Sequence, residues 1–246
     1  MDPNIINSVF PISRIDIYRN GVVVKRKCKL QSGNINEAKR SEIKELSKKS
    51  LSRLAFMVHN TDVKFLSLLT LTYPKMFPHN GTESKTHLRN MLNYLQYEYP
   101  YLEYLWILEF QTKRLAPHYH ILLNVLEPNK YMRQQAAMEW SKVVSRETTE
   151  QGKVFRVHNH PNNWEKIRDK DGAMKYMSRY ALKPHQKKVP QSFSKVGRFW
   201  GCSEAVKPKP LVKDVDITTE EAESYVCCRE KRFEKMSWLP KYIWFK

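Results

Sequence analysis

Two apolar stretches separated by a short basic loop place the strongest constraint on how this chain folds. The stretches are Leu102–Phe110 and Tyr119–Leu126, and the loop between them is Gln111–Pro117. Both stretches have the length and the aliphatic and aromatic content of buried β-strands. We therefore expect two strands here, with the polar loop between them on the surface.

Patterns elsewhere in the chain add strands and helices to this pair. Alternating β-formers around Asn20-Gly21 predict a hairpin over 15–27, and an apolar run ended by prolines predicts a strand over 64–73. Helical spacing of apolar residues predicts helices over 35–57, 84–97 and 129–146, and, after a short strand at 154–158, a helix near 164–183. This mixture predicts an α+β fold in which helices cover an antiparallel sheet.

The composition restricts the class of protein. The chain has 246 residues and a formal net charge of +18, which indicates a polyanionic partner, nucleic acid by default. The apolar runs are far shorter than the ~20 residues of a membrane span, and the first residues are polar, so we expect neither a membrane protein nor a secreted one. Four cysteines without C-x-x-C spacing predict reduced thiols in the cytoplasm.

The sequence His118-Tyr119-His120 is the first candidate for a chemical site. Residues i and i+2 of a strand point to the same face, so the two imidazoles lie together. If the preceding strand pairs with this one, Glu109 comes alongside them. Two histidines and a carboxylate suit Mg²⁺ or Mn²⁺ when phosphate oxygens complete the coordination. On spacing alone, two ordinary histidines at the start of a strand explain the pattern equally well.

A second candidate lies in the helix expected near 164–183. Tyr176, Tyr180 and Lys183 share one helical face, and Arg179 flanks it. Tyrosines in such a stripe are more often packed and half buried. Because cations share this face, however, the stripe also suits a phenol that attacks a phosphate and becomes covalently attached to it.

Together these residues resemble the HUH endonucleases, specifically the rolling-circle replication initiator (Rep) proteins. The segment Leu69–Tyr73 resembles the first motif of that family, Pro117–His120 the second, and Tyr176–Lys183 the third in its two-tyrosine form, as in phage gene A-type initiators. Gly197–Gly201 resembles a segment that follows the third motif in phage and plasmid members. The resemblance covers about residues 60–201 and implies a ferredoxin/RRM-like core of about five antiparallel strands.

The resemblance also implies roles for individual residues. His118 and His120 would be metal ligands, with Glu109 as the third ligand and Gln111 as its alternative. Tyr180 would be the first nucleophile and Tyr176 the second, with Lys183 beside them in the catalytic group. Arg179 stands where lysine is usual, and arginine cannot act as a general acid. The expected DNA contacts are Thr70, Thr72, Arg179, Lys187, Lys188 and Arg198.

These features predict a single nuclease domain over 1–246, in which 1–59 adds a hairpin and a helix and 202–246 adds a basic, aromatic extension. The expected function is nicking and rejoining of single-stranded origin DNA in rolling-circle replication, in the cytoplasm of the host cell of a phage, plasmid or similar replicon. Because the sequence contains no phosphate-binding P-loop, unwinding would fall to a host or separately encoded helicase, which would act with a polymerase. The alternatives are a transposase or relaxase with the same chemistry, or a non-catalytic nucleic-acid-binding module.

Overall fold

A computed structural model describes residues 13–25, 42–125, 128–145, 163–167, 187–217 and 244–245. The chain divides into two compact units, each described here by itself. The sheet unit comprises residues 41–51 and 62–207, and the hairpin unit comprises 1–40, 52–61 and 208–246. The expectation of one nuclease domain over the whole chain stays a prediction.

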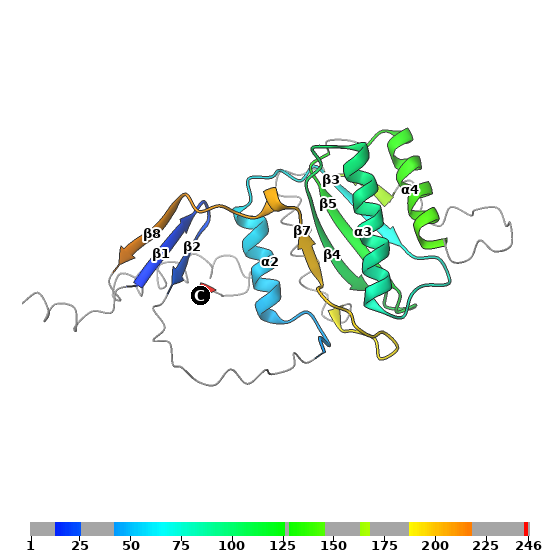
Figure 1. The fold of residues 1–246 in the computed structure, drawn as a ribbon, viewed down its shortest axis with the longest axis horizontal. Helices are drawn as coiled ribbons and strands as arrows, with labels where there is room; N and C mark the ends of the chain where they lie inside the picture. Colours follow the sequence, from blue (N-terminus) through cyan, green and yellow to red (C-terminus); the bar gives the residue numbers. More distant parts are fainter. Residues whose placement is uncertain are drawn as a thin grey trace, which may run out of the picture. The chain divides into compact units, whose positions relative to one another are not determined.

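The sheet unit is built on a five-stranded sheet with the strand order β6-β3-β5-β4-β7 (Figure 1). Every neighbouring pair of strands in it is antiparallel. The two apolar stretches of the sequence become the adjacent central strands β4 and β5, which confirms the predicted α+β class and its antiparallel sheet. The strand bounds are β3 Ser67–Thr72, β4 Tyr104–Phe110, β5 Pro117–Leu123, β6 Trp164–Lys166 and β7 Trp200–Cys202.

Two helices cover one face of this sheet, as Figure 1 shows for α3 (Gly81–Glu98) and α4 (Lys130–Ser145). The side chain of Asn80 caps α3 by accepting hydrogen bonds from the first backbone N–H groups of the helix. Residues of both helices at helical spacing pack against alternate residues of the strands, and the apolar area that this removes from water stabilises the unit. Among the buried core residues are Leu88, Met91, Leu95, Ala136, Trp140, Leu69, Leu71, Leu108, Tyr119 and Ile121.

Two of the expected helices differ in the structure. The helix predicted near 164–183 does not begin at Trp164, because Trp164–Lys166 is strand β6 and its buried indole donates a hydrogen bond of 3.0 Å to Ser67. The helix predicted over 35–57 is α2, Lys48–Asn60. Residues 44–46 are extended instead, since their backbone groups bond to residues 187–189. Periodicity cannot detect such distant backbone partners. The strand predicted at 154–158 lies outside the described residues.

The hairpin unit contains the predicted N-terminal hairpin, formed by β1 (Ser13–Tyr18) and β2 (Gly21–Lys25). Because Tyr18 pairs with Gly21, the two-residue turn is Arg19-Asn20, one position before the predicted one. Strand β8 (Val212–Ile217) adds to β1 in antiparallel orientation, and β9 (Trp244–Phe245) adds to β2 in parallel orientation. The Asn20 backbone N–H donates to Asn60 in α2, which fixes the turn at 2.8 Å.

A buried lysine lies beneath α3 in the sheet unit. The Lys85 ammonium lies 4.6 Å from the centre of the Trp106 ring and 5.1 Å from that of Tyr119. It has no hydrogen-bond partner in the described part of the chain. Burial lowers the pKa of Lys85 from 10.5 to about 7. The two ring faces act in the opposite direction, since they favour the charged amine.

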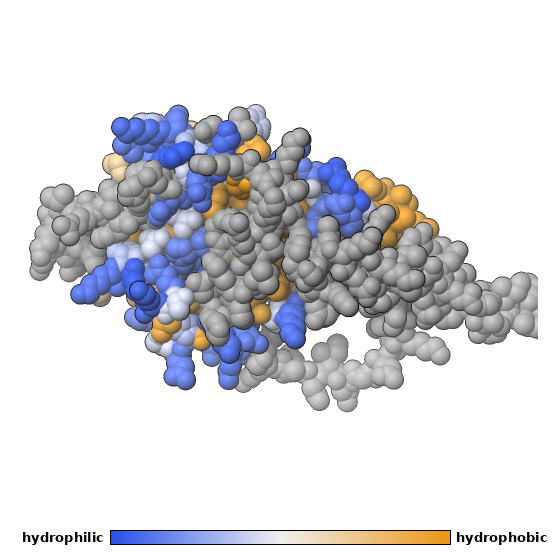
Figure 2. Space-filling view, turned by 180° about the vertical axis from the view of Figure 1, so that it is seen from behind, coloured by the Kyte–Doolittle hydropathy of each residue, from blue (hydrophilic) through white to orange (hydrophobic). Residues whose placement is uncertain are grey.

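The surface seen from the side opposite to that of Figure 1 is mostly hydrophilic where it is coloured, with smaller hydrophobic areas between (Figure 2). None of the described helices has a stretch long and apolar enough to span a lipid bilayer.

Candidate active site

The pairing of three strands gathers the predicted ligands. On β5, His118 and His120 point to the face away from α3 and α4, while Tyr119 between them is fully buried on the helix side. Glu109 on β4 is the cross-strand partner of His118. The sheet therefore brings Glu109 beside the histidines because β4 and β5 are neighbours in this register.

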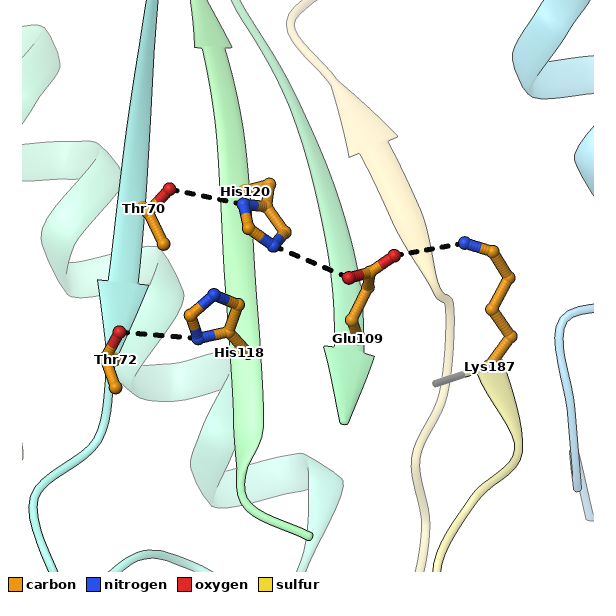
Figure 3. Close-up of polar contacts among 6 residues, drawn as sticks. All are labelled: Thr70, Thr72, Glu109, His118, His120 and Lys187. Carbon is orange, nitrogen blue, oxygen red and sulfur yellow. Dashed lines mark hydrogen bonds and ion pairs between the residues drawn. The ribbon is translucent and has the colours of Figure 1, made fainter. Parts of the chain in front are cut away.

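The histidine rings are held by polar contacts on both sides (Figure 3). The two ring centres lie 4.5 Å apart. The Nε2 atom of His120 lies 3.5 Å from Oε2 of Glu109. On the side toward β3, Thr70 Oγ1 lies 3.2 Å from Nδ1 of His120, and Thr72 Oγ1 lies 3.3 Å from Nδ1 of His118. Each ring thus has its Nδ1 atom directed to a threonine hydroxyl.

A lysine from a distant part of the sequence completes the cluster. Lys187 Nζ donates to Oε1 of Glu109 at 3.1 Å, and the two residues are only 6% and 2% exposed. Burial alone would raise the pKa of the Glu109 carboxyl, but the hydrogen bond from His120 and the charge of Lys187 outweigh it and hold the pKa below its usual value. The predicted DNA contact of Lys187 stays a prediction, and its amine in this structure lies against Glu109.

The cluster is accessible at one end. His120, Glu109 and Lys187 are buried, whereas His118, Thr70 and Thr72 are partly exposed. A substrate would therefore reach the cluster at the end formed by Thr72 and His118.

The side chains match a divalent cation in chemical type but not in arrangement. Two imidazoles and a carboxylate, all on one face, are suitable donors for Mg²⁺ or Mn²⁺. Gln111, two residues after Glu109, has a buried amide oxygen that accepts no hydrogen bond within the described part, so it is available as a further ligand. Among the described residues, however, no three His, Cys, Asp or Glu side chains are placed to hold a metal ion together. In this conformation Glu109 is already bound by Lys187.

The strand ends that carry the cluster are anchored by residues with no role in the motifs. Arg114, in the basic loop between β4 and β5, donates to the backbone carbonyl oxygens of Tyr73 and Pro74, just past the end of β3. Trp140 of α4 is fully buried and donates from Nε1 to the carbonyl of Thr72 at 2.8 Å. These contacts fix the height of β3 relative to the hairpin, and with it the threonine positions.

The Gly197–Gly201 segment is explained by packing. Gly197 has φ = 66°, a backbone conformation that L side chains rarely adopt. Phe199 is buried in the core, and its carbonyl accepts from Leu108 at 2.7 Å. Trp200 donates to Ser50, and a Cβ on Gly201 would lie 2.9 Å from the Trp106 ring. The glycines and aromatics of this segment therefore serve the fold, while Arg198 is exposed.

The remaining predicted site residues separate into two groups. Lys188 is exposed, like Arg198, and neither contributes to the cluster. The third-motif residues Tyr176, Arg179, Tyr180 and Lys183 lie outside the described residues.

Comparison with known families places this cluster in context. Residues 66–185 match the family model of the replication-associated protein ORF2. The match takes in Glu109, both histidines and the tyrosines of the third motif, and amounts to slightly less than half of the chain. It supports a replication initiator. No curated protein and no solved structure gives a significant match to the chain.

Proposed function

We propose that this protein is a metal-dependent endonuclease and strand transferase that initiates rolling-circle replication, as HUH initiators of the two-tyrosine type do. One observation carries the proposal: two histidines and a glutamate lie side by side on neighbouring strands, inside the stretch that matches the replication-associated family. A structural histidine pair would not need a buried carboxylate held next to it.

The proposed reaction conserves the energy of the broken bond. The Tyr180 phenol oxygen attacks phosphorus in single-stranded DNA, the bond from phosphorus to the 3′ oxygen breaks, and that oxygen leaves as a 3′-hydroxyl after taking a proton. The product is a 5′-phosphotyrosine, so rejoining needs no ATP. Tyr176 then attacks the regenerated junction after one round, with Lys183 beside both phenols and Arg179 supplying charge between them.

His118, His120 and Glu109 would hold the cation, Mg²⁺ or Mn²⁺. Bound there, it would offset the negative charge that develops on the scissile phosphate. Because Lys187 also binds Glu109, the carboxylate keeps one oxygen paired and presents the other toward His120. The partly exposed His118 lies where the phosphate would enter.

The proposed substrate is single-stranded origin DNA. A net charge of +18 favours binding to phosphate, and the exposed Lys188 and Arg198 are available to contact it. A host or separately encoded helicase and a polymerase would be the protein partners. The cytoplasm of the host cell of a phage, plasmid or similar replicon is part of the same proposal.

The test is a covalent-adduct assay on single-stranded oligonucleotides that span the origin of the replicon encoding this chain. The native protein, Tyr180→Phe, Tyr176→Phe and the double variant are incubated with Mn²⁺ or with a chelator and separated on a denaturing gel. Tyr97→Phe is the matched control, because it removes a phenol that is 83% exposed on α3. We expect a metal-dependent adduct that the control keeps and the double variant loses.

Other outcomes would overturn parts of the proposal. An adduct that survives in the double variant would refute the tyrosine assignment. Tight binding of origin DNA without any adduct would indicate the non-catalytic module. Cleavage of transfer-origin or transposon-end oligonucleotides but not of the replication origin would indicate a relaxase or a transposase.

A further inference from the structure

The two threonines of β3 have a more specific place in the cluster than a general polar surface would give them. Strand pairing makes Thr70 the cross-strand partner of His120 and Thr72 that of His118. Both hydroxyls lie within hydrogen-bond distance of the Nδ1 atom of their partner, at 3.2 and 3.3 Å. The same contact is thus built twice, two residues apart, by the register of β3 against β5.

Nδ1 contacts matter because a neutral imidazole carries one proton on one of its two nitrogens. A histidine that binds a metal through Nε2 must carry its proton on Nδ1 and donate it to an acceptor. Without a cation, His120 Nε2 faces Oε2 of Glu109 at 3.5 Å, which favours a proton on Nε2 instead. Nδ1 is then an acceptor. The partner of Nδ1 must therefore donate in one state and accept in the other.

A hydroxyl meets this requirement. It carries one proton and two lone pairs, and its O–H bond can rotate. A carboxylate or a backbone carbonyl can only accept, so it would hold the proton on Nδ1 permanently. Lysine and arginine can only donate. Threonine on a strand adds a stiff side chain, since branching at Cβ restricts χ1 and keeps the oxygen in place.

We propose that Thr70 and Thr72 are positioning residues that orient the two histidine rings and allow His120 to change tautomer when a divalent cation binds. In that change Nε2 gives its proton to solvent and Nδ1 takes one from solvent, so the imidazole stays neutral. The Thr70 hydroxyl rotates from donating to accepting. This inference rests on the proposed function, because it concerns the same metal site, and it assigns the threonines a role different from DNA contact.

The first measurement is Mn²⁺ affinity without DNA, from the electron paramagnetic resonance signal of free Mn²⁺. The variants are Thr70→Val, which keeps the shape of the side chain and removes the hydroxyl, and Thr70→Ser, which restores the hydroxyl. Thr86→Val is the matched control, because Thr86 lies exposed on α3 and bonds only to the Thr82 carbonyl there. Loss of a hydrogen bond to a ligating histidine typically weakens metal binding by roughly 10- to 100-fold. We expect at least ~10-fold weaker binding for Thr70→Val and near-native binding for Thr70→Ser and Thr86→Val.

The second measurement reads the tautomer directly. Nitrogen-15 shifts of the histidine side chains distinguish a proton on Nδ1 from one on Nε2. We expect Mg²⁺, which is diamagnetic, to move the His120 proton from Nε2 to Nδ1 in the native protein. In Thr70→Val this change should be incomplete at the same Mg²⁺ concentration. A purely structural role of Thr70 would not alter it.

The outcomes separate this inference from the proposal on which it rests. Native protein that binds neither ion would overturn both. Native protein that binds Mn²⁺, with Thr70→Val binding equally well, would overturn the positioning role and leave the proposed function standing. Weaker DNA binding by Thr70→Val in the presence of a chelator, with unchanged Mn²⁺ affinity, would return the threonine to the DNA-contact role.

Discussion

Replacing Lys187 with methionine should strongly destabilise the sheet unit, because it leaves the Glu109 carboxylate buried without its cation. The two charged atoms are 3.1 Å apart, and the side chains are 7% and 3% exposed. At that distance and an effective dielectric constant of about 20, two unit charges attract by about 5 kcal/mol. Removing one partner of a buried pair typically costs ~3–5 kcal/mol. Since His120 still contacts Glu109, we expect a loss near the lower end, about 3 kcal/mol.

The assay is equilibrium unfolding in urea at pH 7, with a chelator present so that no metal binds in place of the lysine. Lys142→Met is the matched control. Lys142 pairs with Glu139 at a similar distance, 3.3 Å, but its side chain is 54% exposed. Exposed pairs of this kind contribute ~0.2–1 kcal/mol, so the control should lose less than about 1 kcal/mol. The same chemical change thus probes a buried and an exposed pair.

A double-mutant cycle isolates the pair itself. Glu109→Gln should also destabilise the protein, because it leaves the buried lysine without its anion. The combination Lys187→Met with Glu109→Gln removes both charges and should cost clearly less than the sum of the single changes, with a coupling of roughly 2 kcal/mol or more. Additive single changes, or a loss below about 1 kcal/mol for Lys187→Met, would refute the buried ion pair.

Three further predictions concern other parts of the molecule. Lys85→Met should raise the free energy of unfolding at pH 7 by ~2–4 kcal/mol, because a pKa lowered from 10.5 to about 7 opposes folding by at most about 5 kcal/mol and the ring of Trp106 offsets part of that. Native stability should rise between pH 7 and 10.5, where the unfolded chain binds more protons, and thermal melts across this range should show a flatter profile for the variant. Gly81→Ala should lower the urea midpoint by an amount equivalent to ~1–3 kcal/mol, since its Cβ would meet the Lys195 backbone; an unchanged midpoint would contradict the close approach. Arg198→Ala should reduce the slope of log affinity against log salt by about one for single-stranded DNA, measured by fluorescence anisotropy, and an unchanged slope would exclude a phosphate contact.

The parts of the fold that sequence reasoning predicted are those set by local patterns. The two central strands and helices α3 and α4 follow from continuous apolar runs and helical spacing, which depend only on residues nearby. The placement of His118 and His120 on one face follows from strand alternation. Glu109 comes beside them because adjacent apolar strands with a short connection pair with each other.

The parts that could not be predicted depend on contacts between distant segments. Residues 44–46 are extended because they pair with 187–189, and Trp164 lies on an edge strand because it pairs with Leu69 and bonds to Ser67. Lys187 has no recognisable spacing to Glu109, 78 residues earlier, so no motif could have identified it. A lysine close to the family motifs was a reasonable candidate for DNA contact, and its burial could be seen only in the fold.

The segment over 187–199 links the stability of the fold to the state of the site. It starts with Lys187, which holds Glu109, and continues into Phe193 and Phe199, which both pack against Phe110 at the end of β4. Glu109 is the residue before Phe110, so the segment fixes that strand end from both faces of the sheet. Loosening of this segment would release the Glu109 carboxylate and the strand end together. Cation binding at Glu109 and packing of residues 187–199 are therefore coupled, because both act on the same end of β4.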